Sequence, residues 1–262
     1  MWAGGMDFAE AFDYTAAGVE KSYERSAARI GLPRPDFLTI HDLEPERHGT
    51  DGVQRCLDDL VSGPSPGWEH LTQMRDSGLV GGLGAGLNRL DMAHEFWARG
   101  IDVDFFLVAG RLTLLENEAH DGAVGEEVRR FLAGCEERGT RLMVGGVFNS
   151  GVLITGSDDP DSKFDYGAVP AAVTERVRRL EAVCRSHGVA LPEAALQYPT
   201  VAHGQAGLEG EDGAQAKAGT GTVAAIIPGV DDSSMLRGNV ALLDKPVPES
   251  LWADLRTEGL IG

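Results

Sequence analysis

The stretch that most constrains the fold of this 262-residue chain is a short buried strand, 37–43, that follows directly on an amphipathic helix. The helix covers 15–30, because apolar residues recur there at helical spacing, Thr15 is a good N-cap and Gly31 follows its end. The strand ends in His41 and Asp42. Chemistry in parallel α/β folds sits at the carboxyl ends of the strands, so the pattern predicts a functional site at His41.

The same alternation of strand and helix continues to the end of the chain. After the first strand, we expect four further strands to begin at Leu79, Ile101, Arg141 and Val223. The segments between and after them have helical patterns, at 52–60, 68–76, 91–99, 124–135, 168–187, 192–198, 234–242 and 251–260. Strands that alternate with helices predict an α/β fold with a parallel sheet, here as a single domain over 1–262.

The composition of the chain restricts the classes of molecule that it can bind. The net charge of −18 argues against nucleic acid and acidic membrane surfaces, and no apolar run is long enough to span a membrane. Three cysteines, Cys56, Cys135 and Cys184, form no CxxC pair and no metal-ligand spacing. Such cysteines are typical of small core residues in a reducing compartment, so we expect a cytoplasmic protein.

The string from FDYTAAGVEKSYERSAARIGL to LTIHDLE closely resembles the aldo-keto reductases, in particular the branch of sugar and pyridoxal dehydrogenases. The resemblance implies a (β/α)8 TIM barrel that oxidises a small sugar or alcohol, such as L-fucose at C1, by hydride transfer to NAD(P). It implies that His41 is the family's catalytic histidine, which hydrogen-bonds the reacting oxygen. Tyr14 and Lys21 match no catalytic position, and we interpret them as a packing residue and a solvated residue.

The resemblance also implies where the coenzyme binds. Asn88, after the glycine-rich strand, is the candidate for holding the nicotinamide carboxamide, although Gly86 replaces the family's usual serine. The stretch after the fourth strand resembles the family's pyrophosphate loop, in which glycine lets the backbone approach the phosphates. Its candidate coenzyme-binding residues are Phe148, Asn149, Ser150, Gly151 and Leu153.

The last strand and its exit resemble the family's adenosine-phosphate site, with Gly229, Asp231 and Asn239 as candidates. NADP-preferring members use a lysine and an arginine here, and this chain has Gly229 and Met235 at those positions. An acid near the ribose repels a 2′-phosphate and accepts from a 2′-hydroxyl. We therefore expect NAD as cofactor, with NADP left open by Arg237.

Five strands are fewer than the eight of the family barrel, and the helix at 15–30 resembles the family's third. The resemblance therefore implies a barrel that is incomplete at its N-terminus, with strands four to eight present and with the family's catalytic tyrosine, lysine and aspartate missing. Such a sheet has open edges, so we expect self-association through them. The alternative to an active dehydrogenase is a catalytically dead fragment or a non-enzymatic interaction protein of the same fold.

Two further features complete the expectations. Residues 204–221 are rich in glycine and poor in large apolar side chains, which predicts a flexible insertion. His41 and Asp42 could be read as ligands of a metal-dependent barrel hydrolase, but no His-x-His motif and no second histidine at a strand end accompany them. We therefore assign no metal ligand.

Overall fold

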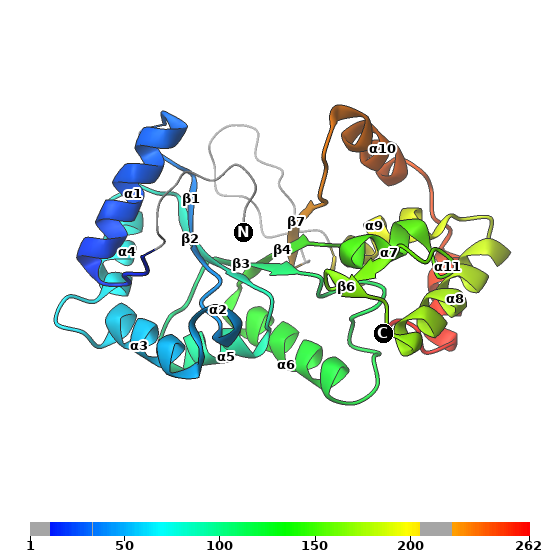
Figure 1. Cartoon of the computed structure of the whole chain (residues 1–262), viewed down its shortest axis with the longest axis horizontal. Helices are drawn as coiled ribbons and strands as arrows, with labels where there is room; N and C mark the ends of the chain where they lie inside the picture. Colours follow the sequence, from blue (N-terminus) through cyan, green and yellow to red (C-terminus); the bar gives the residue numbers. More distant parts are fainter. Residues whose placement is uncertain (1–10, 33, 205–221) are drawn as a thin grey trace.

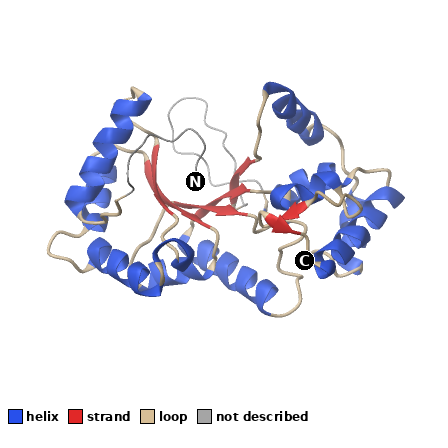
Figure 2. Cartoon of the chain, viewed as in Figure 1, coloured by secondary structure: helices blue, strands red, loops and turns tan. Residues whose placement is uncertain are grey.

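The structure is a computed structural model that describes residues 11–32, 34–204 and 222–262 (Figure 1). Its centre is a parallel sheet of five strands in the order β1-β2-β3-β4-β7 (Figure 2). The strands are β1 (Phe37–His41), β2 (Gly82–Leu87), β3 (Phe105–Ala109), β4 (Arg141–Gly145) and β7 (Val223–Ile227). The expected parallel α/β sheet is thus confirmed for the described residues.

Strand neighbours in this sheet are also neighbours in sequence, apart from a small hairpin inserted before β7. β1 and β7 form its two edges, so the described strands do not close into a barrel. The expectation of a TIM barrel that is incomplete at its N-terminus stays a prediction. The register shifts once, between Leu142 and Met143, where β4 pairs with β7.

Helices follow the strands along the chain and flank the sheet, whereas α10 stands away from it (Figure 1). α1 begins as predicted, because the Thr15 hydroxyl accepts a hydrogen bond from the Gly18 amide at 3.3 Å, and it ends at Gly31 in the left-handed conformation. The helices are α1 (Ala16–Ile30), α2 (Pro45–His48), α3 (Thr50–Val61), α4 (Gly67–Asp76), α5 (Asp91–Ala98), α6 (Ala123–Arg138), α7 (Val152–Thr155), α8 (Ala171–Ser186), α9 (Leu191–His203), α10 (Ser233–Leu243) and α11 (Glu249–Thr257), with one 3₁₀ turn, η1 (Asn149–Gly151).

Two strands begin later than the sequence pattern predicts. Leu79 and Ile101 do not open strands; each follows a glycine with positive φ, Gly78 or Gly100, that closes the preceding helix. The Leu79 and Ile101 amides donate back to the carbonyls of Met74 and Phe96 in those helices. An apolar residue directly after a helix-ending glycine packs back on the helix, which explains the error.

Several short elements were not expected, among them η1 and α7 after β4. The polar segment 44–50 contains the helical turn α2, and β5 (Lys163–Phe164) pairs with β6 (Gly167–Ala168) in an antiparallel hairpin. The hairpin takes the residues just before α8, so that helix begins at Ala171 and not at 168. The insertion expected at 204–221 lies, after Gly204, outside the described residues.

The core lies between the sheet and the helices that flank it. Its aromatic centre is Trp97, Phe106 and Phe131, whose ring centroids lie 5.6–6.2 Å apart. β2 is buried along its whole length, whereas Phe37 and His41 on the edge strand β1 are exposed. Among the described residues, no helix is both long and apolar enough to cross a bilayer.

Candidate active site

His41 is the last residue of β1, so its side chain lies at the carboxyl end of the sheet. Its imidazole is 64% exposed, and its Nδ1 lies 3.5 Å from Oδ2 of Asp42. The opposite residue on β2 is Gly86. A Cβ atom built on Gly86 would lie 2.8 Å from Cδ2 of His41, so the glycine leaves room for the imidazole.

Asp42 connects His41 to the end of the neighbouring strand. Its backbone adopts a left-handed φ of 50°, and its amide donates to the Gly86 carbonyl at 3.2 Å. Its Oδ1 accepts a hydrogen bond at 3.2 Å from the side-chain nitrogen of Asn88, which directly follows β2. The structure therefore brings His41, Asp42 and Asn88 together at adjacent strand ends.

A cavity of about 1440 Å³ opens beside β1 and is lined by His41, Asp42 and the facing side of α1, including Lys21. Tyr14 lines it as well, and burial raises the pKa of this phenol to about 12, with Cys56 and Asp42 adding in the same direction. The Tyr14 ring lies edge-on to His48, with ring centroids 6.1 Å apart. Lys21 is exposed, as expected of a solvated residue.

The candidate pyrophosphate loop follows β4. Asn149, Ser150 and Gly151 adopt consecutive positive φ angles of 47°, 60° and 105°, which turns the backbone sharply into η1 and α7. Asn149 is 4% exposed and donates its amide to the Gly110 carbonyl at 3.0 Å, so its nitrogen holds the loop to the end of β3. Phe148 and Leu153, 7% and 0% exposed, belong to the hydrophobic core and hold the loop against it.

Ser150 is the exposed member of this loop. Its hydroxyl accepts a hydrogen bond from the Tyr166 amide at 3.1 Å, and Tyr166 belongs to the hairpin turn between β5 and β6. The hairpin, which sequence reasoning missed, thus supports the loop. Its turn residues Asp165 and Tyr166 both have positive φ without being glycine, which explains why no turn signal was visible.

The candidate adenosine site follows β7. Gly229 and Asp231 are exposed, and Asp232 caps α10 by accepting from the amides of Ser234 and Met235 at 2.7 and 2.9 Å. Asn239, 9% exposed, projects from the middle of this helix. The structure therefore places Gly229 and Asp231 between β7 and α10 and Asn239 in the middle of α10, beyond the edge strand opposite to that of His41.

Comparison with known proteins identifies the family. A family model described as aldo/keto reductase matches residues 5–257. The chain belongs to the aldo/keto reductase family. It is 32% identical over 260 residues to pyridoxal 4-dehydrogenase of Microbacterium luteolum, an alignment covering 99% of this chain and 67% of that protein. It is 31% identical over 255 residues to D-threo-aldose 1-dehydrogenase of a Pseudomonas species, covering 97% and 66%.

This aldo-keto reductase chain therefore spans about two thirds of the length of both curated relatives. Solved structures show the same fold. An aldo-keto reductase of Bacillus halodurans in its holo form superposes with a TM-score of 0.62 at 16% identity, covering 96% of this chain and 69% of that one. Glycerol dehydrogenase of Gluconobacter oxydans gives a TM-score of 0.58 at 15% identity, covering 98% and 68%.

Aldo-keto reductases use NAD(P)H, and two buried atoms fit the expected coenzyme residues. Oδ1 of Asn149 and Nδ2 of Asn239 are buried, and neither has a hydrogen-bond partner among the described residues. A buried polar atom without a partner is costly. Both residues are coenzyme candidates, so a bound nucleotide would give these two atoms a partner; seven other buried side-chain atoms among the described residues also have none.

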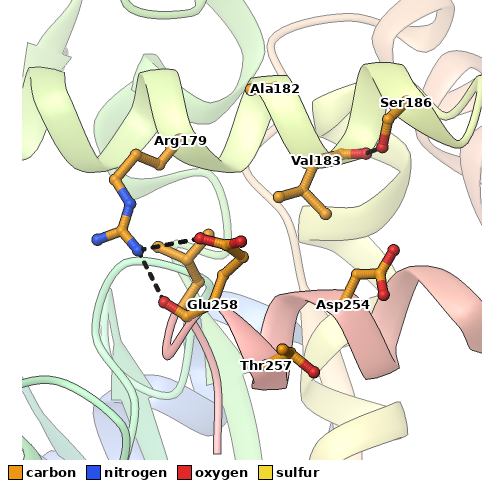
Figure 3. A pocket seen from close by; sticks show the side chains of 8 residues that line it. Arg179, Ala182, Val183, Ser186, Asp254, Thr257 and Glu258 are labelled. Atoms are coloured by element: carbon orange, nitrogen blue, oxygen red, sulfur yellow. Dashed lines mark hydrogen bonds and ion pairs between the residues drawn. The ribbon is translucent and has the colours of Figure 1, made fainter.

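A second hollow, of about 480 Å³, lies between α8 and α11 (Figure 3). There Arg179 donates to the Glu258 carbonyl at 2.7 Å and lies 3.7 Å from its carboxylate. None of its lining residues belongs to the candidate site, and this contact fastens the last helix to α8. Within the described ranges no cluster of three or more His, Cys, Asp or Glu side chains could hold a metal ion.

Proposed function

We propose that this chain is an NAD(P)-dependent oxidoreductase that oxidises an aldose such as L-fucose, or a related alcohol, at C1. The observation that carries the proposal is the juxtaposition of His41, Asp42 and Asn88 at adjacent strand ends. Family membership and the names of the two curated relatives, a pyridoxal and an aldose dehydrogenase, support the same reaction class.

His41 has the role of orienting the reacting oxygen. Its Nδ1 lies 3.5 Å from the carboxylate of Asp42, which favours the tautomer that carries its hydrogen on Nδ1. The exposed ring then presents Nε2 to the cavity, where it can share a hydrogen bond with a hydroxyl or carbonyl oxygen. Such an arrangement aligns a small polyol and polarises the bond between C1 and its oxygen.

The coenzyme supplies the hydride acceptor, and the chain supplies contacts at three places. Asn88 would hold the carboxamide end, the turn at 149–151 would offer its backbone and the Ser150 hydroxyl to the pyrophosphate, and Gly229, Asp231 and Asn239 would contact the adenosine. Asp231 is exposed just before α10 and would accept from a ribose 2′-hydroxyl, which would make NAD the preferred form.

Coenzyme binding tests the proposal directly. Titration of the purified chain with NAD+ by isothermal calorimetry should give saturable binding, and His41→Asn should leave that binding unchanged. Turnover of L-fucose with NAD+, assayed for this chain and for the longest reading frame that contains it, should be lost in His41→Asn. A chain that binds neither NAD+ nor NADP+ would overturn the proposal and favour the non-enzymatic interaction protein.

A further inference from the structure

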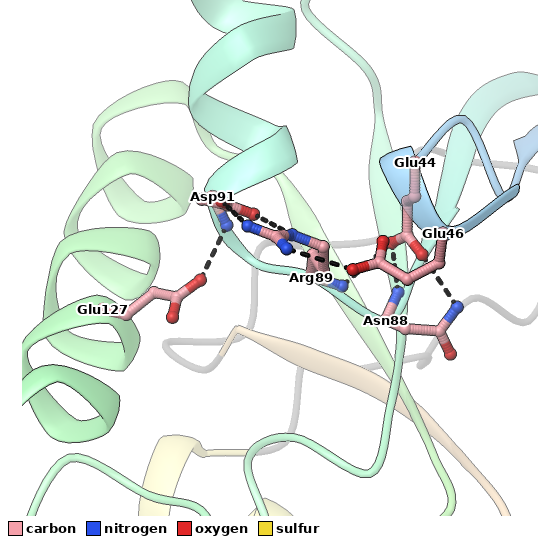
Figure 4. Close-up of polar contacts among 6 residues, drawn as sticks. All are labelled: Glu44, Glu46, Asn88, Arg89, Asp91 and Glu127. Carbon is pink, nitrogen blue, oxygen red and sulfur yellow. Dashed lines mark hydrogen bonds and ion pairs between the residues drawn. The ribbon is translucent and has the colours of Figure 1, made fainter. Parts of the chain in front are cut away.

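A buried carboxylate lies beneath the candidate nicotinamide contact. Glu44 is three residues beyond His41 and is 3% exposed. Its Oε1 accepts hydrogen bonds from the backbone amides of Asn88 and Arg89, at 2.5 and 2.9 Å. Its Oε2 accepts from the side-chain nitrogen of Asn88 at 3.0 Å. All three donors come from the loop between β2 and α5 (Figure 4).

These contacts determine which way the Asn88 amide faces. Its Nδ2 lies between two carboxylates, Glu44 at 3.0 Å and Asp42 at 3.2 Å. Carboxylates only accept hydrogen bonds, so the amide nitrogen must face them with both of its hydrogens, and a flipped amide would bring oxygen against oxygen. The amide oxygen of exposed Asn88 is therefore turned away from both acids.

The rest of the loop is fastened on its other side. Arg89 donates to Asp91 at 3.0 and 2.5 Å and to Glu46 at 3.1 Å. The Asp91 amide in turn donates to Glu127 on α6 at 2.9 Å (Figure 4). The loop is thus held from several elements, whereas within the described part of the chain the Asn88 side chain donates to Glu44 and Asp42.

We propose that Glu44 is a positioning residue, which locks Asn88 so that its Oδ1 accepts from the amide hydrogens of the nicotinamide carboxamide. This inference rests on the proposed function, because it names the coenzyme contact of the same site. A bare carboxylate buried in this way is stabilised by its three donors. The arrangement selects for a ligand group that donates, which the carboxamide does.

Glu44→Gln separates positioning from simple support of the loop. The glutamine oxygen still accepts from the backbone amides of Asn88 and Arg89, so the loop keeps both of these hydrogen bonds. Its new NH2 group faces Nδ2 of Asn88, and two donors cannot bond to each other. Asn88 must then rotate and lose its fixed orientation. Glu46→Gln is the matched control, because among the described residues Glu46 contacts this loop through the Arg89 side chain and not through Asn88.

The test compares two ligands by calorimetry. NAD+ carries the carboxamide, whereas ADP-ribose carries the same adenosine and pyrophosphate without it. Glu44→Gln should weaken NAD+ binding about tenfold, as expected for one good hydrogen bond to an oriented group, and leave ADP-ribose binding within about twofold. Asn88→Ala should lose a similar factor, and Glu44→Gln added to it should cause no further loss. Glu46→Gln should change neither ligand.

Equal weakening of NAD+ and ADP-ribose in Glu44→Gln would overturn the positioning role. A second measurement works without coenzyme: the side-chain NH2 resonances of Asn88 in a ¹H–¹⁵N spectrum, assigned from their loss in Asn88→Asp. They should shift in Glu44→Gln and stay in place in Glu46→Gln; unchanged resonances in Glu44→Gln refute the inference. If the unmodified chain bound neither ligand, the proposed function would fail, and these resonances would still decide whether Glu44 orients Asn88.

Discussion

Two glycines of β2 allow one substitution to be compared at neighbouring positions of the same strand face. Neither Gly84 nor Gly86 has a positive φ, so alanine fits the backbone at both. At Gly84 an added Cβ would lie no more than 2.6 Å from each of three ring atoms of Phe105. At Gly86 it would lie 2.8 Å from a single ring atom of His41. We predict that Gly84→Ala destabilises the fold and that Gly86→Ala does not.

The magnitude follows from what each ring can do in response. Phe105 is 4% exposed and lies edge-on to Phe37 at 5.2 Å, so it has little room to retreat. Overpacking of this kind costs about 1–3 kcal/mol, and the smaller unfolded-state entropy of alanine returns about 0.4–1 kcal/mol. The closeness to three ring atoms puts the cost in the upper part of its range, which leaves a net loss of about 1–2.5 kcal/mol. At roughly 2–4 °C per kcal/mol for a chain of this size, Tm should fall by about 2–10 °C. His41 is 64% exposed, so its ring can turn toward solvent by the few tenths of an ångström required, and Gly86→Ala should stay within about 0.5 kcal/mol.

Urea unfolding followed by tryptophan fluorescence, with thermal melts alongside, measures both variants. Gly84→Ala/Phe105→Leu, which gives the new methyl group room, should recover part of the loss. If Gly84→Ala were as stable as the unmodified chain, or if Gly86→Ala lost as much as Gly84→Ala, the packing argument would be wrong. Gly86→Ala should in addition shift the His41 ring resonances, since the ring must turn to admit the methyl group.

Three further predictions concern the coenzyme, pH and association. Asp231→Arg should raise the NADP+ to NAD+ affinity ratio about tenfold, because arginine pairs with a 2′-phosphate; a preference for NADP+ in the unmodified chain would contradict the assignment of Asp231. The hydrogen bond from Lys245 lowers the pKa of Glu193 below 4.5, so the folded state binds fewer protons than the unfolded state. The difference in stability between the unmodified chain and Glu193→Gln should therefore be complete above pH 4.5 and vanish as pH falls below it. A pH-independent difference in Tm would refute this. Leu236 and Val240 on α10 are each 50% exposed. Sedimentation should therefore show self-association, and replacement of both residues by lysine should reduce it. A chain that sediments as a monomer at every concentration would contradict this prediction.

The helices could be predicted well because the signals that begin and end them are local. Thr15 caps α1 and Gly31 ends it through contacts within a few residues of themselves. The same local signals misplaced two strands, since Leu79 and Ile101 look like strand residues but complete helix ends. The hairpin at 163–168 escaped because Asp165 and Tyr166 adopt positive φ without glycine.

The candidate site could be predicted only where one strand end carries a chemically distinctive residue. His41 stands out at the end of a strand, and Asn88 follows the next strand along the chain. Glu44 could not be predicted, because its hydrogen-bond partners lie 44 and 45 residues away and nothing in its own neighbourhood signals them. Its role depends on which strand pairs with β1, which only the sheet order reveals.

Tyr14 and His41 line the same cavity. Tyr14 is nevertheless poorly suited to the remaining chemical step, which is transfer of a proton to or from the reacting oxygen. A proton-transfer group works best when its pKa lies near the working pH. Burial raises the pKa of Tyr14 to about 12, and its charged neighbour Asp42 raises it further instead of lowering it as a cation would. The phenol therefore stays protonated and is a poor acid and a poor base near neutral pH. Its edge-on packing against His48 accounts for its presence, and the chemistry that the described residues offer is orientation of the oxygen by His41.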